Sequence, residues 1–209
     1  GLITLIDTWF GYLIDKLKRL NLLENSLIIF TSDHGTNFAD NPKGIIGKPH
    51  YSMYQSLVRI PLLIHLPEAR EKGRVISELA YNIDITATIY DILGLLDTKN
   101  LRIDGQSLLP LIVGEKSKWI TREYLTGRYG DSIWYRDEKL WAILDIDGNF
   151  LEAFEIKNEE VIMKDISNEL SEDYKDKVWQ RILNDAGGEV PDYRHLYHTF
   201  YTDALGEKK

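Results

Sequence analysis

The chain has 209 residues, of which 44% are hydrophobic, so it is long enough to bury a core as one large domain or as a domain with a small appendage. The formal net charge is −8, and Lys and Arg are scattered along the chain, which predicts that nucleic acid is not a partner. Cysteine is absent, which excludes disulfides, thiolate metal sites and a cysteine nucleophile. No apolar run reaches the roughly 20 residues of a membrane helix, and no signal-peptide pattern occurs. The chain is therefore predicted to be soluble and away from membranes, in a compartment that the sequence does not indicate.

The first predicted element is a helix over residues 2–20 with one buried face. Its apolar residues recur at helical spacing, as Ile3, Ile6, Phe10, Leu13, Ile14 and Leu17. The helix opens without a capping residue, so we expect that this end is the cut edge of a longer protein.

Two short apolar runs follow, and both are typical of strands buried on both faces of a parallel sheet. They are Leu27–Thr31 and Leu62–Leu66, the second bounded by Pro61 and Pro67. Between them, residues 36–50 lack any period and predict a loop, and residues 51–59 predict a short helix.

The next elements predict a change of architecture near residue 118. A helix is expected over residues 84–93, with Asp84 as its N-cap and Gly94 past its end, and a short helix around residues 108–112. Segments 120–126, 132–136, 139–144 and 150–156 are short and rich in aromatic and β-branched residues, which favours an antiparallel sheet, and a helix follows at 171–184.

The predicted fold class is thus α/β: a partial, mostly parallel sheet flanked by helices over residues 1–118, then a small antiparallel sheet with a helix and tail over residues 119–209. Two strands cannot form a stable parallel sheet with both faces covered. We therefore expect the other strands to come from a missing N-terminal half or from a second chain.

Asp33 and His34 come directly after the first buried run, and Gly35 allows the backbone to turn there. Ligands of α/β sheets bind beyond the carboxyl ends of the strands. A carboxylate oxygen and an imidazole nitrogen suit a divalent cation, so Asp33 and His34 are candidate metal ligands. The alternative is a polar turn in which neither residue binds a metal.

Lys48 lies between Gly47 and Pro49, in a stiff loop that would project one ammonium toward an anionic oxygen. The alternative is a solvated loop lysine, and Lys43 is a nearby competitor. His50 follows closely and is a candidate for contacting the substrate, with a packing role as its alternative.

Several blocks of the chain together resemble the sulfatase family of the alkaline-phosphatase-like superfamily, in the order and approximate spacing of that family over residues 1 to about 113. These blocks are the helix Leu2–Leu20, the run Asn25–Gly35 that ends in Thr-Ser-Asp-His-Gly, the Gly47-Lys48 loop, Val58–Ile64, Asn82–Thr88, Leu93-Gly94 and Asp104–Pro110. Residues after about 113 resemble the C-terminal antiparallel subdomain of the family more weakly.

The resemblance implies roles for these residues. Asp33 and His34 would be ligands of one divalent metal, with Ca²⁺ favoured and Mg²⁺ or Mn²⁺ as alternatives. Lys48 would contact the sulfate group and act in catalysis, so the implied activity is hydrolysis of a small-molecule sulfate ester.

The chain also departs from the family pattern. The formylglycine nucleophile of the family arises in a Cys/Ser-x-Pro/Ala-x-Arg signature, and no such signature occurs in this sequence. The formylglycine is expected only in the missing N-terminal half, so this chain alone is predicted to be inactive. Two other readings stay open: a phosphonate monoester or phosphodiester hydrolase of the same superfamily, and a truncated, non-catalytic interaction module.

Overall fold

The computed structural model describes residues 1–96 and 102–194, and the chain divides into two compact units that alternate along the sequence. Unit 1 comprises residues 1–33, 61–77 and 82–120. Unit 2 comprises residues 34–60, 78–81 and the chain from residue 121 onward. The division into domains at residue 118 remains a prediction.

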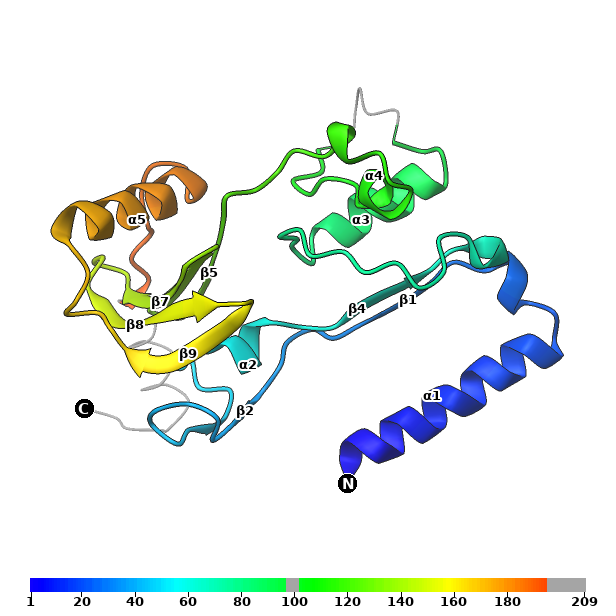
Figure 1. Ribbon diagram of the computed structural model, residues 1–209, viewed down its shortest axis with the longest axis horizontal. Coiled ribbons are helices and arrows are strands. Elements are labelled where there is room, and N and C mark those ends of the chain that lie inside the picture. Colours follow the sequence, from blue (N-terminus) through cyan, green and yellow to red (C-terminus); the bar gives the residue numbers. More distant parts are fainter. Residues whose placement is uncertain (97–101, 195–209) are drawn as a thin grey trace, which may run out of the picture. The chain divides into compact units, whose positions relative to one another are not determined.

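Unit 1 holds a long helix, a two-stranded ribbon and two shorter helices (Figure 1). Its elements are α1 (Leu2–Arg19), η1 (Leu23–Asn25), β1 (Ile28–Thr31), β4 (Leu62–His65), η2 (Pro67–Ala69), α3 (Asp84–Ile92), α4 (Leu109–Ile112) and η3 (Lys116–Lys118). The predicted helices and both predicted strands of this part are therefore present, with ends shifted by a few residues.

The pairing of β1 with β4 corrects the predicted parallel sheet. The two strands are antiparallel, with Ile28 opposite His65 and Thr31 opposite Leu62. A parallel neighbour needs a crossover that carries the chain back to the starting end of the first strand. Here the chain leaves β1 after Thr31 and re-enters β4 at Leu62, beside the point of exit, so β4 runs in the opposite direction.

The predicted burial of unit 1 is also wrong in two places. No residue of α1 is buried, and Trp9 of the helix is 65% exposed. The helix contacts the ribbon through Phe10, whose ring centroid lies 4.9 Å from that of Phe30. The strand β1 is only partly buried, because its sheet has two strands and β1 has a neighbouring strand on one side only.

Asp84 starts α3 in a different way from the one predicted. Ile83 is the N-cap and Asp84 is the first helical residue, with a fully buried side chain. Its Oδ1 accepts a hydrogen bond of 2.9 Å from the backbone N–H of Gln106. Asp84 therefore connects the helix to the 104–108 turn instead of capping it.

Unit 2 is built on a five-stranded antiparallel sheet whose strands lie in sequence order (Figure 1). The strands are β5 (Tyr124–Tyr129), β6 (Ser132–Asp137), β7 (Leu140–Asp145), β8 (Phe150–Lys157) and β9 (Glu160–Asp165). The predicted antiparallel sheet is confirmed, while its last strand was missed in the sequence. The segment of β9 is half charged and sits at the sheet edge, so it lacks the apolar signal of the other strands.

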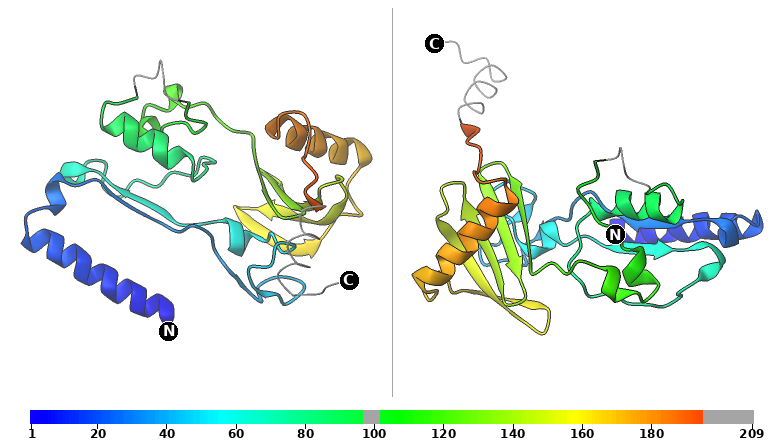
Figure 2. Two further views of the ribbon diagram at one scale, coloured as in Figure 1. Left: turned by 180° about the vertical axis from the view of Figure 1, so that it is seen from behind. Right: turned by 90° about the horizontal axis from the view of Figure 1, so that it is seen from above.

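Helix α5 (Glu172–Asp185) covers one face of this sheet, and it lies across the strands in Figure 2. Ser171 caps the helix, because its side chain accepts a hydrogen bond from the backbone N–H of Tyr174. Val178 and Ile182 are 1% and 2% exposed and pack into a cluster with Tyr135, Leu144 and other residues of that face.

The segment 34–60 covers the opposite face of the sheet. It contains α2 (Gln55–Val58), which lies within the short helix predicted over residues 51–59. It also contains the short antiparallel strands β2 (Asn37–Phe38) and β3 (Ile46–Gly47), where the sequence predicted only a loop. Tyr54 and Leu57 pack against the stacked rings of Trp134 and Trp141, whose centroids are 5.5 Å apart. We call this second cluster the loop-side core.

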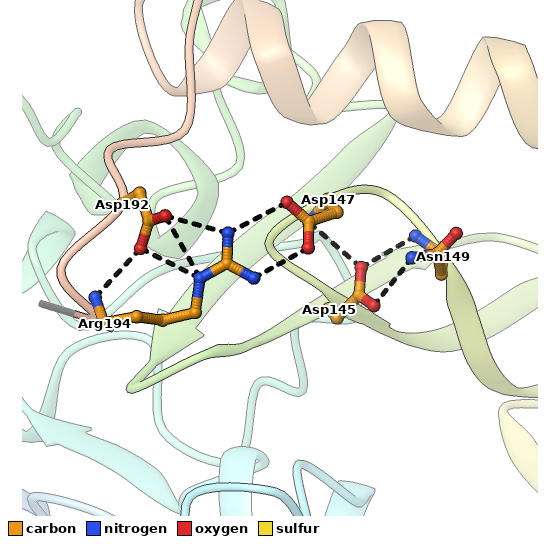
Figure 3. Close-up of polar contacts among 5 residues, drawn as sticks. All are labelled: Asp145, Asp147, Asn149, Asp192 and Arg194. Carbon is orange, nitrogen blue, oxygen red and sulfur yellow. Dashed lines mark hydrogen bonds and ion pairs between the residues drawn. The ribbon is translucent and has the colours of Figure 1, made fainter.

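The Asp147-Gly148 turn joins β7 to β8, and Arg194 holds the C-terminal arm to this turn (Figure 3). The Arg194 guanidinium lies 2.8 Å from Asp147 Oδ2 and 2.8 Å from Asp192 Oδ2. Hydrogen bonds to Asp192 and Asp147 raise the pKa of Arg194, so this group stays charged at all ordinary pH values.

Candidate functional site

The candidate site begins where the chain leaves β1 and enters unit 2 at His34. The N–H groups of Gly35 and Thr36 donate to the carbonyl oxygens of Leu57 and Ser56, at 2.8 and 3.1 Å. A Cβ on Gly35 would lie 2.0 Å from the Ser56 oxygen, so only glycine permits this approach. The backbone after His34 is therefore fixed against α2.

His34 and Lys48, which are 14 residues apart in the sequence, meet in unit 2. Lys48 Nζ lies 2.8 Å from His34 Nε2, and both residues are exposed to solvent. The structure thus brings together two of the four residues that the sequence singled out.

The hydrogen bond made by Nδ1 of His34 determines whether Nε2 of the same ring has a free lone pair. His34 Nδ1 lies 2.8 Å from the carbonyl oxygen of Gly35, which can only accept, so Nδ1 carries a proton and donates. In the neutral ring Nε2 then has a lone pair, which accepts from the Lys48 ammonium. The same lone pair is the one that a metal ion would use.

Asn37 is the residue of this site that sequence analysis missed. Its side chain is fully buried, and its Nδ2 lies 3.0 Å from the Gly47 carbonyl oxygen and 2.9 Å from Ser52 Oγ. Ser56 Oγ donates to Asn37 Oδ1 at 3.0 Å. Asn37 therefore ties β2, α2 and the residue directly before Lys48 together. Only its place in the Asp-His-Gly-Thr-Asn run hinted at this role.

Asp33 is the last residue of unit 1, and its side chain is exposed. Ser32 Oγ lies 3.4 Å from Asp33 Oδ1. Within residues 1–96 and 102–194, no three His, Asp or Glu side chains stand together as a metal site. Asp33 and His34 thus offer donors of the right chemistry for part of a divalent-cation site, and the described chain does not complete it.

His50 is exposed and lies among aromatic rings of unit 2. Its ring makes edge contacts with Tyr51, at 5.6 Å between centroids, and with Tyr129, at 6.4 Å. The ring also lies against Gly130 at the turn between β5 and β6. The structure gives His50 a packing role and leaves its predicted contact with substrate untested.

Lys43, the predicted competitor of Lys48, makes an ion pair with the sheet instead. Its Nζ lies 2.6 Å from Oε1 of Glu152, whose side chain is only 8% exposed. Burial raises the pKa of the neighbouring Tyr54, and the carboxylate of Glu152 raises it further. Lys43 therefore anchors the 38–46 loop to β8, which leaves Lys48 as the lysine that faces His34.

Comparisons with known proteins show which family the N-terminal part of the chain resembles. Residues 1–95 match the family model described as Sulfatase. The chain is 32% identical over 120 residues to the endo-4-O-sulfatase of Bacteroides thetaiotaomicron, an alignment that covers 56% of this chain and 22% of that protein. It is 36% identical over 123 residues to the multifunctional alkaline phosphatase superfamily protein PehA of Trinickia caryophylli, covering 58% of this chain and 23% of that protein.

The fold has solved counterparts as well. A structure described as BT4656 in complex with its substrate D-glucosamine-2-N,6-O-disulfate matches 92% of this chain and 41% of its own, with a TM-score of 0.72 and 22% identity. This likeness concerns the fold alone. The chain spans less than a quarter of the length of the two curated relatives. No helix in the described part of the chain is both long and apolar enough to cross a membrane. On the family match and these relatives together, residues 1–95 carry a segment of the sulfatase family.

Proposed function

We propose that the chain forms part of the active site of a metal-dependent sulfuric ester hydrolase. Asp33 and His34 are assigned as metal ligands, Lys48 as the group that contacts the sulfate, and His50 as a substrate contact. The observation that carries the proposal is the 2.8 Å approach of Lys48 Nζ to His34 Nε2, because it brings the proposed sulfate contact to a proposed metal ligand.

The hydrogen-bond pattern of His34 supports its part in this proposal. The Gly35 carbonyl holds the proton on Nδ1 and so presents the lone pair of Nε2, which is the common arrangement of a histidine that binds a metal. A divalent cation bound by Asp33 and His34 would supply positive charge to the ester oxygens.

Lys48 and the cation would compete for the single lone pair of His34 Nε2. When His34 ligates through Nε2, the Lys48 ammonium has to leave it, because one lone pair serves one partner. The ammonium then remains beside the site as a point charge for an anionic sulfate oxygen. Asn37 keeps Lys48 within reach by holding the Gly47 carbonyl.

The proposed metal ion needs more ligands than Asp33 and His34 supply. Ca²⁺ is favoured, with Mg²⁺ or Mn²⁺ as alternatives, and a Ca²⁺ ion takes about six to eight oxygen ligands. Asp33 and His34 are too few for that, so the remaining ligands and a formylglycine nucleophile would come from a segment or chain outside these residues. By itself the chain is then expected to bind metal weakly and to be inactive.

A second candidate function is hydrolysis of a phosphonate monoester or phosphodiester. It is supported by the 36% identity to a relative named as a multifunctional alkaline phosphatase superfamily protein. The charges needed to hold a sulfate or a phosphate oxygen are the same, so the residues of this chain serve either ester.

The proposal is tested by turnover of the complete hydrolase on an aryl sulfate, a phosphate diester and a phosphonate monoester. Sulfate ester turnover should exceed the other two. Lys48→Met should lower it by about two to three orders of magnitude, the usual effect of removing one charge-stabilising group. Lys139→Met removes an exposed lysine elsewhere in unit 2 and should leave turnover unchanged. Equal turnover of wild type and Lys48→Met would refute the role of Lys48, and a preference for the phosphate diester or the phosphonate would favour the second candidate.

A further inference from the structure

A surface hollow of about 420 Å³ lies in unit 2 beside helix α5. Its wall comes from residues 147–150 at the β7–β8 turn, from residues 167–168 before the helix, and from one face of α5. Among the described residues that line it, none belongs to the segment 34–60 that holds Lys48. The volume is in the range of sites that bind small molecules.

Trp179 of α5 forms one side of this hollow. Gly148 lies directly against its indole, because a Cβ on Gly148 would come within 2.9 Å of the ring carbons. The indole also packs on the buried cluster that α5 forms with the sheet. Packing therefore holds an aromatic wall in place before any ligand binds, which lowers the entropic cost of binding.

The charges around the hollow are partly paired. Arg194 makes two hydrogen bonds to the Asp147 carboxylate, at 2.8 and 3.2 Å (Figure 3). Lys175 Nζ lies 2.9 Å from Glu172 Oε1. Asp176 is exposed and has no ion pair or hydrogen bond with any other side chain that the structure describes. Three carboxylates thus lie beside two cations, and the net negative charge disfavours sulfate esters and other anions.

Three neutral polar groups of the wall have no hydrogen-bond partner within the described part of the chain. They are the side-chain amide of Asn168, the indole N–H of Trp179 and the amide oxygen of Asn149. The Asn149 amide is oriented by its Nδ2, which donates to Asp145 Oδ2 at 2.8 Å (Figure 3). The Trp179 N–H is in contact with solvent rather than enclosed by protein. The hollow therefore offers both donors and acceptors to a ligand.

These groups together select one ligand chemistry. Trp179 can only donate and the Asp176 carboxylate can only accept, whereas the Asn168 amide does both. An ammonium ion has donors alone and cannot accept from Trp179 or Asn168, and an anion is repelled by the carboxylates. A sugar hydroxyl both donates and accepts, and the C–H face of a sugar ring suits an aromatic wall.

We propose that the hollow beside α5 is a binding site for an uncharged sugar residue, with Trp179 as its aromatic wall and Asn168 and Asp176 as its hydrogen-bonding groups. So few contacts give weak affinity, because most of their free energy is offset by the cost of association. The site is separate from the Lys48 site and does not rest on the proposed hydrolase function.

The test is titration of the isotope-labelled chain with D-glucose, D-galactose and D-mannose, followed by NMR. At least one of the three sugars should shift the Trp179 indole N–H signal saturably, and this signal is identified by its loss in Trp179→Phe. Asn168→Ala and Asp176→Ala should each raise the dissociation constant by about threefold or more, the effect of losing a hydrogen bond. Asn184→Ala and Asp173→Ala remove matching exposed residues of α5 that do not line the hollow, and should bind as wild type does.

Lys48→Met separates this site from the proposed active site. It should leave the sugar-induced shift unchanged, whereas loss of binding in Lys48→Met would place the sugar at Lys48 and overturn the proposal. The 6-sulfate ester of the sugar that binds should bind more weakly, since the wall is net negative, and tighter binding of the ester would contradict an uncharged ligand.

Three other results would overturn the sugar site. They are the absence of a saturable shift with all three sugars, unchanged binding in both Asn168→Ala and Asp176→Ala, and a Trp179 signal that responds to tetramethylammonium chloride but to no sugar. Asn168 and Asp176 are exposed, so their alanine variants should keep the fold and leave these results interpretable.

Discussion

Asn37 satisfies acceptors from two different loops with one amide group, and its own carbonyl accepts from Ser56. Asp has nearly the same shape and, as a carboxylate, no proton to donate. Asn37→Asp should therefore lower the free energy of unfolding by about 1–3 kcal/mol, the effect of unsatisfied buried groups, in urea titrations at pH 7. Asn184→Asp on the exposed surface of α5 is the matched control. Equal stability of the two variants would mean that Asn37 does not hold the loop.

The ion pair between Lys43 and Glu152 has one buried and one half-exposed partner, with side chains 8% and 53% exposed. Lys43→Met would leave the Glu152 carboxylate buried without its cation. We expect a loss of about 1–3 kcal/mol in unfolding free energy, below the full effect for a buried pair because Lys43 is half in solvent.

Two comparisons make that prediction specific to burial. Lys164→Met breaks the exposed pair with Glu169, whose partners are 72% and 61% exposed, and should change the stability by less than about 0.5 kcal/mol. The double variant Lys43→Met with Glu152→Met should be less destabilised than the sum of its single variants. Additive single effects would show that the pair is not coupled.

At the residue scale, the sequence predicted the candidate site residues that lie at the end of an apolar run or between glycine and proline. Asp33, His34 and Lys48 were visible because a buried run ends at the first two and glycine and proline frame the third. Asn37 was not, because a polar residue in a loop without periodicity looks solvated until the packing of Gly47, Ser52 and Ser56 around it is known.

Among the elements, α2 and the 34–37 segment depend on one close backbone contact. A methyl group on Gly35 would meet the Ser56 carbonyl oxygen at 2.0 Å and push the two segments apart. Gly35→Ala should lower the thermal midpoint of the chain and speed amide hydrogen exchange at Gly35 and Thr36 positions. Gly11→Ala is the control, since nothing lies within 4 Å of that position and alanine favours its helix by about 0.5–1 kcal/mol. Similar exchange rates in both variants would contradict the contact.

The strands β8 and β9 are joined through Asp165, whose Oδ1 accepts from the N–H groups of Ala153 and Ser167 at 3.0 and 2.9 Å. Burial favours the neutral acid, yet these hydrogen bonds outweigh it and hold the pKa of Asp165 below its usual value. A lowered folded-state pKa means that the stability it contributes is present above the unfolded-state pKa of about 3.9 and is lost as the pH falls below it.

Comparing wild type with Asp165→Asn in urea at several pH values tests this link. The unfolding free energy of wild type should exceed that of Asp165→Asn by a constant amount between about pH 8 and pH 5, and the difference should shrink below about pH 4. An advantage that stays the same down to pH 2 would show that Asp165 is not responsible for acid sensitivity.

The sequence predicted most helices and strands because their apolar periods are strong. It missed β9, an edge strand in which half of the residues are charged. It also missed β2 and β3, which are two residues each and are held by Asn37 rather than by propensity. It also placed β1 and β4 in a parallel sheet. A continuous apolar run indicates a buried strand, while the direction of pairing depends on where the intervening chain returns, which no local pattern contains.

For the whole molecule, the sequence predicted a sulfatase resemblance, and the family match over residues 1–95 confirms it. The organisation into two units that alternate along the chain was not predictable, because residues 34–60 leave unit 1 and pack on a sheet more than sixty residues further on. Trp141 illustrates the reason, since its Nε1 donates to the carbonyl oxygen of Met53, a contact across 88 positions.

The most direct test of the account is the metal content of the full-length protein, measured by plasma emission after gel filtration alongside its turnover of an aryl sulfate, the proposed activity. Asp33→Ala and His34→Ala should lose both the bound divalent cation and turnover. Lys48→Met should keep the cation and lose turnover by about two to three orders of magnitude. Full metal content in Asp33→Ala and His34→Ala would contradict the central claim that a cation is held at the end of β1.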